Sequence, residues 1–307
     1  MDWKATLRSR GYLLSDGAWG TELAKMGMTP GEAAERWNLD HPDLVEKVAR
    51  AYVRAGSDII LTNTFGANSF KLGRVGLAAQ AAILNRRGTE ISKRAAGTKA
   101  LVFASVGPTG EMMAPLGDKK EADFIECFAE QISACAGGGA DGIVLETMAD
   151  LAEALAALTA ARQVCRLPVV ASMTFDRTSK GFATMMGVAP QKAAAVLGAA
   201  DADMVGANCG AGIDNMIEVT KAMRRATRLP LWIKPNAGLP QLVDGKTVFR
   251  ETPEEMAGKV EALLEAGANV IGGCCGTTPG HIRKIAAAAA EAKETALRAN
   301  RKVLQAL

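Results

Sequence analysis

The sequence is poor in the features that mark several protein classes. It has two histidines, and its net charge of +3 comes without a run of basic residues. The absence of a run of basic residues argues against a nucleic-acid partner. Two histidines also give no indication of a histidine acid–base pair. No apolar stretch is long enough for a transmembrane helix, and the first residues lack the apolar core of a signal peptide. We therefore expect a cytoplasmic protein with no nucleic-acid or membrane partner.

Cysteine is also scarce, with six residues in 307. Without an export signal, six cysteines in a chain of this length do not indicate a disulfide framework, so we expect reduced thiols. Cys127, Cys135 and Cys165 fall within or just after predicted helices, where a cysteine behaves as a small apolar core residue. The other three cysteines stand in two short glycine-bounded segments and need a different explanation.

What the sequence does have is a regular alternation of short apolar runs and amphipathic helical segments, within a chain that is 49% hydrophobic. The predicted strands span residues 12–16, 58–64, 100–106, 142–147, 169–175, 204–209, 231–235 and 269–274. The predicted helices span residues 42–55, 78–96, 121–136, 150–165, 190–199, 214–227 and 253–266, with a last helix from residue 279.

Eight strand-then-helix units at a spacing of roughly thirty to forty residues predict an α/β fold, a (β/α)8 TIM barrel. No linker or low-complexity segment interrupts them, so we expect a single domain over residues 1–307. An open doubly wound sheet is the alternative, but no glycine-rich dinucleotide-binding segment accompanies the repeats. We expect Met185 and Met186 to fill the core, with an apolar wall near the rim as the alternative.

Polar and glycine-rich segments collect at the predicted strand ends, where a barrel places its catalytic groups. Cys209 ends one strand, and the adjacent Cys274 and Cys275 end another, inside the segment GGCCG. Neighbouring side chains of a regular strand point apart, whereas flanking glycines let the backbone turn and aim both sulfurs one way. Three sulfur ligands with an open fourth position are typical of a catalytic zinc site, so we predict Zn²⁺ at these cysteines. The alternative is three buried, inert thiols.

Two carboxylates share the predicted strand ends. Asp16 and Glu146 have no lysine or arginine beside them in the sequence, so both are candidates for binding a substrate ammonium group. Otherwise they are a turn aspartate and a rim glutamate bonded to backbone amides. A glycine-rich loop follows Asp16 and could present backbone N–H groups to a carboxylate. It consists of Gly17, Ala18, Trp19, Gly20 and Thr21. Together these groups predict an amino-acid substrate that carries a thiol, which zinc would activate.

These segments resemble the homocysteine S-methyltransferase family, which includes the methyl-accepting barrel of cobalamin-dependent methionine synthase and the betaine– and S-methylmethionine–homocysteine methyltransferases. The resemblance runs over nearly the whole chain. It is carried by DGAWGT at 16–21, LTNTFG at 61–66, GPTGE at 107–111, ET at 146–147, GANC at 206–209, PNAG at 235–238 and GGCCGT at 272–277. The two cysteine segments, in this order, are the most specific of them.

The resemblance implies zinc-dependent transfer of a methyl group to the thiol of homocysteine, forming methionine. It implies that the three cysteines hold the zinc ion. Asn236 is the expected catalytic residue, filling the fourth zinc position until the substrate sulfur displaces it. The betaine branch of the family uses a tyrosine directly after the glutamate for this purpose, but this chain has Thr147 there.

The same resemblance implies a homocysteine-binding set. Asp16 and Glu146 are expected to bind the ammonium group, and the amides of the loop 17–21 are expected to bind the carboxylate. Asn208, directly before the first cysteine, belongs to the expected substrate-binding residues.

The methyl donor must carry its methyl group on a good leaving group. We expect betaine or a related onium compound, which Trp19, Phe65 and Phe175 could meet through cation–π contacts. Short bacterial members similar to this chain, including at TMMG (184–187), are described as betaine–homocysteine methyltransferases. The alternative is the homocysteine-binding subunit of a split cobalamin-dependent synthase, which takes its methyl group from a separate corrinoid protein. The chain ends at Leu307 without the cobalamin modules of the large synthases, and nothing in it indicates an oligomeric state.

Two functions outside this family also stay open. A phosphate-binding barrel isomerase or aldolase would bind a substrate phosphate with residues 272–277, after the eighth strand. A measurement of zinc content would distinguish such an enzyme from a zinc-dependent methyltransferase. A non-catalytic zinc store or thiol sensor would hold metal but show no homocysteine-dependent turnover.

Overall fold

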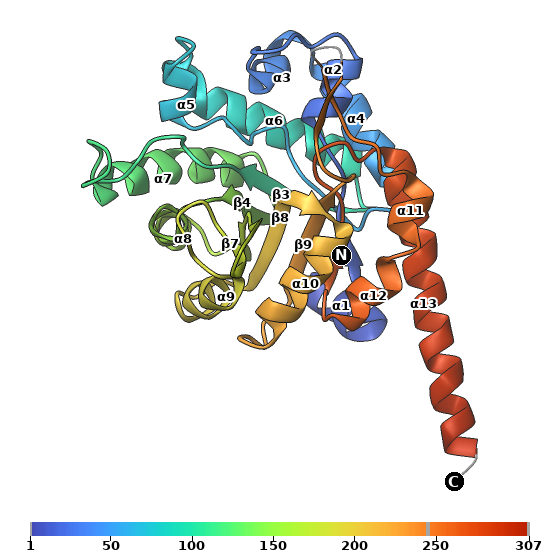
Figure 1. Cartoon of the computed structure of the whole chain (residues 1–307). Helices are drawn as coiled ribbons and strands as arrows, with labels where there is room; N and C mark the ends of the chain where they lie inside the picture. The colour runs from blue at the N-terminus through green and yellow to red at the C-terminus, as the bar shows by residue number, and fades with distance from the viewer. Residues whose placement is uncertain (1, 244–245, 306–307) are drawn as a thin grey trace.

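Eight parallel strands form the centre of the molecule (Figure 1), known from a computed structural model that describes residues 2–243 and 246–305. The strands are β1 (Leu13–Leu14), β2 (Ile59–Ile60), β3 (Leu101–Val106), β4 (Gly142–Met148), β5 (Val169–Met173), β8 (Met204–Gly212), β9 (Leu231–Asn236) and β12 (Val270–Ile271). Each coincides with a predicted strand region, although β4, β8 and β9 continue one, three and one residues beyond it. β1, β2 and β12 are only two residues long, because the polar segments after them leave the sheet ladder.

The sheet closes into a barrel between β1 and β2. The pairing order is β1-β12-β9-β8-β5-β4-β3-β2, with every neighbouring pair parallel. Across the remaining gap, Asp58 N donates to Leu14 O at 2.8 Å, and the Asp58 carboxylate accepts from Leu14 N at 2.7 Å. A doubly wound sheet would leave both edge strands free. The predicted (β/α)8 barrel is therefore confirmed.

Helices surround the barrel (Figure 1). They are α4 (Pro42–Ala55), α6 (Ala81–Ala96), α7 (Glu121–Gly137), α8 (Leu151–Val164), α9 (Pro190–Ala199), α10 (Ile213–Arg224), α11 (Pro253–Ala257), α12 (Val260–Glu265) and α13 (Pro279–Gln305). The predicted helix 253–266 is divided, because the chain turns at Gly258 and Lys259 between α11 and α12. Among the helices in residues 2–243 and 246–305, none is both long and apolar enough to cross a membrane.

Several short elements were not predicted. They are α1 (Trp3–Arg10), α2 (Gly20–Lys25), α3 (Trp37–Asp40), α5 (Ser69–Gly73), the 3₁₀ helix at Ala34–Arg36, and the hairpins β6 (Asp176–Thr178)–β7 (Gly181–Ala183) and β10 (Gln241–Val243)–β11 (Lys246–Val248). All except α1 lie between a barrel strand and the next barrel helix. Met185 and Met186 follow β7 and are 73% and 36% exposed. Their expected core position is wrong, because the β6–β7 hairpin leads this segment out of the packed layers.

Apolar side chains fill the first part of the barrel interior. The rings of Phe103 and Trp232 stack there with their centroids 6.0 Å apart. Ser105 and Lys234 lie two residues further along the same strands, so they face the same interior, and both are almost fully buried. The barrel interior therefore changes from apolar to polar toward the C-terminal ends of the strands.

A second apolar layer lies between the strands and the helices. Cys127 and Cys135 on α7 are buried in it, and Cys165 packs against it after α8. Burial raises the pKa of Cys135 to about 12, so this thiol stays protonated and inert. The prediction of a core position is confirmed for Cys127 and Cys135, whereas Cys165 is only partly buried at the edge of the core.

Candidate metal centre and substrate pocket

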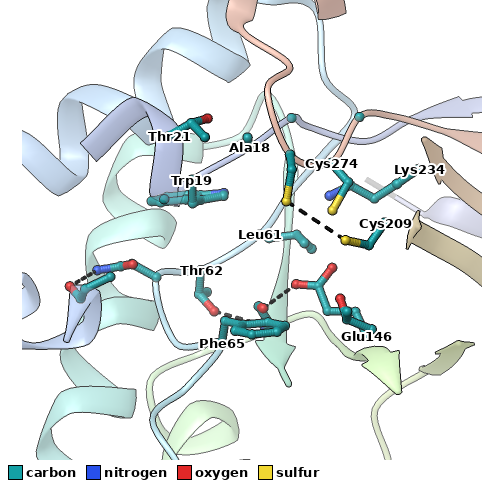
Figure 2. Close-up of a pocket in the computed structure, with 18 of the residues that line it drawn as sticks. Ala18, Trp19, Thr21, Leu61, Thr62, Phe65, Glu146, Cys209, Lys234 and Cys274 are labelled. Carbon is teal, nitrogen blue, oxygen red and sulfur yellow. Dashed lines mark hydrogen bonds between the residues drawn. The ribbon is translucent and has the colours of Figure 1, made fainter. Parts of the chain in front are cut away.

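Three cysteine sulfurs meet at the C-terminal end of the barrel (Figure 2). The Sγ atoms of Cys209, Cys274 and Cys275 all lie within 4.8 Å of one another, and those of Cys209 and Cys275 are 4.0 Å apart. Cys209 belongs to β8, and the other two follow β12. Both strands pair with β9, so their ends lie close although 65 residues separate Cys209 from Cys274. The three predicted ligands therefore converge.

Unusual backbone conformations aim these sulfurs. Cys209 has φ +62°, which is rare for a residue other than glycine, and β8 is irregular between Cys209 and Gly212. A Cβ added at Gly272 would lie 2.6 Å from Asp16 O, and one at Gly273 would lie 2.4 Å from Thr277 Oγ1. The glycines before the cysteine pair are therefore required by close packing. This backbone arrangement lets two adjacent cysteines contribute to one cluster.

The cluster has the chemistry of a metal site. Hydrogen bonds from the Cys274 and Cys275 thiols lower the pKa of Cys209, so a thiolate forms readily there. The Asn236 side chain donates to Gly210 O at 2.8 Å and also hydrogen-bonds Cys209, but its Oδ1 is buried without a hydrogen-bond partner. A buried oxygen lacking a donor is costly, and a cation would satisfy it. Three sulfurs and one oxygen suit four-coordinate zinc.

A cavity of about 370 Å³ opens beside the sulfurs. Its wall includes the three cysteines, Glu146, Lys234 and all five residues of the loop 17–21, as Figure 2 shows for most of them. Of the other residues predicted from the sequence, Asp16, Asn208 and Asn236 do not contribute to the wall. The structure therefore divides the predicted site into residues that face the cavity and residues that lie behind it.

Glu146 faces the cavity from the end of β4. Its Oε1 accepts a hydrogen bond from Ser105 Oγ, whereas Oε2 has no hydrogen-bond partner among the residues that the structure describes. Burial raises the pKa of Glu146 to about 7, and the nearby Lys234 ammonium opposes this rise only in part. One carboxylate oxygen is thus free to accept a hydrogen bond from a bound molecule.

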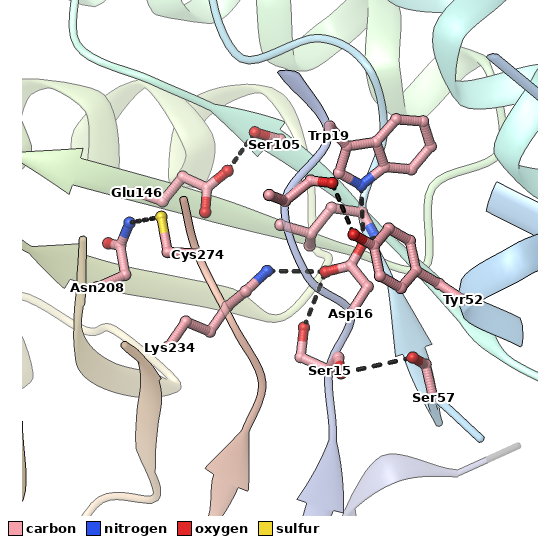
Figure 3. A network of polar contacts seen from close by, with 12 residues as sticks. Ser15, Asp16, Trp19, Tyr52, Ser57, Ser105, Glu146, Asn208, Lys234 and Cys274 are labelled. Atoms are coloured by element: carbon pink, nitrogen blue, oxygen red, sulfur yellow. Dashed lines mark hydrogen bonds and ion pairs between the residues drawn. The ribbon is translucent and has the colours of Figure 1, made fainter. Parts of the chain in front are cut away.

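Asp16 has a different environment from the one expected. It is fully buried, and its Oδ1 accepts from Lys234 Nζ at 2.7 Å, while Oδ2 accepts from Trp19 Nε1 at 2.8 Å and Leu61 N at 2.7 Å (Figure 3). Both oxygens are occupied by the protein's own donors, and Asp16 lies behind the cavity wall. Without a ligand Asp16 holds Lys234, and its expected contact with a substrate ammonium group stays a prediction.

The loop 17–21 lines the cavity, but one of its amides is already used. Ala18 N donates to Thr277 Oγ1 at 3.1 Å, and Tyr52 Oη donates to Ala18 O at 2.6 Å. Gly17 is packed so closely that an added Cβ would lie 2.7 Å from Thr277 Oγ1. Thr21 Oγ1 is buried without a partner. Ala18 N is therefore already engaged, and the part that the other amides of this loop play in carboxylate binding stays a prediction.

Asn208 connects the ends of three strands. Its Oδ1 accepts from Thr147 N at 2.8 Å and Ser172 Oγ at 2.7 Å, and its Nδ2 donates to Thr147 Oγ1 at 2.7 Å. Thr147 has φ +60° and directly follows Glu146. Asn208 is fully buried and also contacts Cys274 Sγ at 3.8 Å (Figure 3). Asn208 therefore positions residues that face the cavity, and its expected substrate-binding role stays a prediction.

Replacing Asn208 by alanine should lower the free energy of unfolding by about 2 kcal/mol, because buried groups of Thr147 and Ser172 lose their partner. Urea denaturation measures this loss. Asn215→Ala is the matched control, because Asn215 accepts only a surface hydrogen bond from Arg177, and it should change stability by less than about 0.5 kcal/mol. An Asn208→Ala protein as stable as the parent would contradict the positioning role.

Sequence reasoning missed Lys234. A signal was present, because a lysine two residues after Trp232 in an apolar strand must share its inward face. Of the aromatic residues named as donor contacts, Trp19 and Phe65 line the cavity, whereas Phe175 is buried outside it. Lys71 Nζ lies 4.7 Å from the centroid of the Phe65 ring.

Comparison with known proteins agrees with this geometry. The family model described as homocysteine S-methyltransferase matches residues 13–289. The methionine synthases of Mycobacterium tuberculosis and Mycobacterium leprae are each 33% identical over 303 and 307 residues, or 93% and 94% of this chain. The chain spans only 25% of the length of these two relatives.

A solved structure resembles the whole barrel. The metallated form of the homocysteine methyltransferase MmuM from Escherichia coli superposes with a TM-score of 0.78 at 25% identity, covering 92% of this chain and 98% of that one. That relative binds a metal, as its description as metallated states.

Proposed function

The chain belongs to the homocysteine S-methyltransferase family, and from this premise we propose that it methylates homocysteine to methionine at a zinc ion held by Cys209, Cys274 and Cys275. As a member of the family, the protein is a methyltransferase that acts on a thiol. Because the chain belongs to this family, we set aside the other candidate functions, namely a barrel isomerase or aldolase and a non-catalytic zinc store or thiol sensor. The metal, the donor and the residue roles are our proposal.

One observation carries the proposal. Three thiols lie within 4.8 Å of one another beside a cavity, and the Asn236 amide, whose buried oxygen has no partner, hydrogen-bonds Cys209. When bound, zinc would lower the pKa of a coordinated substrate thiol and keep its sulfur nucleophilic at neutral pH. We assign Asn236 Oδ1 as the fourth ligand in the absence of substrate.

The chain's own residues would bind and orient the substrate. Glu146 Oε2 accepts from the homocysteine ammonium group, while Asn208 holds the adjacent Thr147 in its unusual conformation. The transferred methyl group forms a bond to the homocysteine sulfur as its bond to the donor atom breaks, and the donor atom keeps the electron pair. The thiol proton leaves to solvent. No side chain needs to form a covalent intermediate.

We propose a small onium compound, such as betaine, as the methyl donor. Trp19 and Phe65 face the same cavity as the cysteines (Figure 2), and aromatic faces attract methylated cations. Glu35 adds a carboxylate to the same wall. These groups would hold a positively charged donor beside the sulfur.

Exposed apolar side chains on the loops around the cavity support a second candidate for the methyl donor. Leu116, Met185, Leu239 and Leu242 lie in the segments after β3, β5 and β9 and are 61–78% exposed. Exposed apolar side chains on one rim are typical of a protein-binding surface. They favour, as the alternative, a separate corrinoid protein that delivers the methyl group, in line with the relatives named methionine synthase.

An assay of methionine formation tests both candidates. The zinc-loaded protein is given homocysteine together with betaine, dimethylsulfoniopropionate, S-methylmethionine or methylcobalamin, in separate reactions. Turnover with an onium compound supports the first candidate. Turnover only with methylcobalamin, or with a corrinoid protein that carries it, supports the second. The absence of methionine from every reaction, with metal content verified, would overturn the proposal.

Glu146→Gln should weaken homocysteine binding by about 10- to 100-fold while the zinc content stays the same, because the neutral amide loses a charge-assisted hydrogen bond to the ammonium group. The pKa of Glu146 is raised to about 7. Below that pH the carboxyl group is neutral, so homocysteine affinity of the parent protein should rise from pH 6 to pH 8. The variant should lack this part of the rise. Calorimetric titration at several pH values measures both effects.

4-Mercaptobutanoic acid, which lacks the ammonium group, is the control ligand. It should bind the parent and Glu146→Gln with similar affinity, because its thiol ionises in the same way but it makes no contact with Glu146. Equal homocysteine affinities of the two proteins would exclude Glu146 from substrate binding.

A further inference from the structure

Thr277 connects the segment of the cysteine pair to the loop that lines the cavity. It lies two residues after the pair and is fully buried. Its hydroxyl donates to Cys274 O at 2.6 Å and accepts from Ala18 N at 3.1 Å. One hydroxyl group therefore joins a predicted metal ligand to the loop 17–21, and Figure 2 shows Ala18 and Cys274 on neighbouring segments at one edge of the cavity.

Close packing on both sides restricts this hydroxyl. An added Cβ would lie 2.7 Å from Thr277 Oγ1 at Gly17 and 2.4 Å from it at Gly273. Because both residues are glycines, the two backbone segments can approach the hydroxyl directly. Thr277 N also donates to Cys274 O at 3.1 Å, so the turn that carries the hydroxyl is fixed to the cysteine. The hydroxyl thus has a defined place between the two segments.

A second hydroxyl holds the same residue of the loop. Tyr52 Oη, on α4, donates to Ala18 O at 2.6 Å and lies 3.4 Å from Thr277 O. Ala18 is therefore held through both its N–H and its C=O groups. Tyr52 is fully buried, and within residues 2–243 and 246–305 neither Tyr52 nor Thr277 belongs to the cavity wall. Both residues therefore act on a ligand through their neighbours.

We propose that Thr277 and Tyr52 hold the loop 17–21 at a fixed distance from the three cysteine sulfurs, and that this distance selects a thiol amino acid of the chain length of homocysteine. The inference rests on the proposed function, which places the substrate sulfur at the cysteines. It also rests on the predicted binding of the α-carboxylate by amides of the loop other than that of Ala18. Thr277 and Tyr52 are positioning residues, because neither touches the substrate.

Cysteine as a ligand measures how strictly this distance is kept. It carries the same thiol, ammonium and carboxylate groups as homocysteine but is one methylene group shorter. With its sulfur on the metal, it cannot reach a fixed loop as well as homocysteine does. One methylene group in a fitted site is worth about 10- to 200-fold in discrimination. A loop without its two hydrogen bonds can follow the shorter ligand, so this discrimination should fall.

The test measures the dissociation constants of homocysteine and cysteine by calorimetry on zinc-loaded proteins, so the result does not depend on the methyl donor. Thr277→Val removes the hydroxyl and keeps the branched shape, whereas Thr277→Ser keeps the hydroxyl. Tyr52→Phe removes the bond to Ala18 O and leaves the Thr277 hydroxyl in place. Thr220→Val is the control, because Thr220 is equally buried and its hydroxyl donates to Met216 O within α10.

The parent, Thr220→Val and Thr277→Ser should bind homocysteine about 10- to 200-fold more tightly than cysteine. In Thr277→Val and in Tyr52→Phe this ratio should fall by at least about fivefold, because the loop is no longer held at one distance. Zinc content should stay the same in every variant, because all three cysteine sulfurs are retained. A general structural defect would weaken both ligands alike and leave the ratio at the parent value.

A ratio that stays at the parent value in both Thr277→Val and Tyr52→Phe overturns the positioning role and leaves the proposed function standing. A parent protein that binds the two amino acids equally does the same. A fall in one variant alone assigns the role to that residue and removes it from the other. If Thr277→Val does not fold, the ratio in Tyr52→Phe decides. A zinc-loaded parent that binds no homocysteine overturns the proposed function itself, and the positioning role with it.

Discussion

Cys209→Ala should bind zinc more than about 100-fold more weakly than the parent protein. Removing a residue that only hydrogen-bonds a metal ligand usually costs about 10- to 100-fold in metal affinity, and this variant removes a ligand itself. The variant removes one of three sulfurs that lie within 4.8 Å of one another, and it also removes the thiol whose pKa is lowered by the other two. Methyl transfer should fall by about 10³-fold, because metal activation supplies several kcal/mol and each 1.36 kcal/mol is a factor of ten.

Metal analysis after dialysis against a chelator, with turnover measured on the same samples, checks this result. Cys165→Ala is the matched control, because that cysteine lies at the end of α8 and belongs to no cluster of potential ligands in the described part of the chain. It should retain both zinc and activity. A Cys209→Ala protein with one zinc ion per chain would remove Cys209 from the ligand set.

Lys234→Met should lower the free energy of unfolding by about 3–5 kcal/mol, the usual cost of leaving one partner of a buried ion pair without its counter-charge. Lys234 and Asp16 are 2% and 0% exposed, and their charged atoms are 2.7 Å apart. Without the ammonium group, the Asp16 carboxylate keeps Trp19 Nε1 and Leu61 N as donors but has no cation.

Urea denaturation of the parent, the single variant and Asp16→Asn/Lys234→Met measures this cost. The double variant should recover most of the lost stability, since replacing both members of a buried pair is often neutral. Arg36 and Asp40 on the surface provide the control pair: their side chains are 57% and 44% exposed, so Arg36→Met should cost less than about 1 kcal/mol. A Lys234→Met protein that loses no more than this control would show that the buried pair is not needed for stability.

Much of the architecture follows from the sequence, because it depends on local signals. The alternation of apolar runs and amphipathic segments predicted all eight strands. Because the strands of a barrel are parallel, their polar C-terminal ends were predicted to lie on one rim. The short elements between strands and helices, such as α2 and the β6–β7 hairpin, were missed. They are too short for periodicity to mark them, and their conformation depends on packing against the rim.

The same division applies to the site. By itself the sequence determined the barrel and brought Cys209, Cys274 and Cys275 to one rim, because the ends of parallel strands meet whatever their separation along the chain. Only the tertiary structure decided that Asp16 pairs with Lys234, 218 residues away, and that Asn208 lies behind the cavity wall. Such partners depend on which side chains of different strands share one level of the barrel interior. Strand stagger and local irregularities, such as the φ of +62° at Cys209, set that level, and local sequence patterns do not encode it.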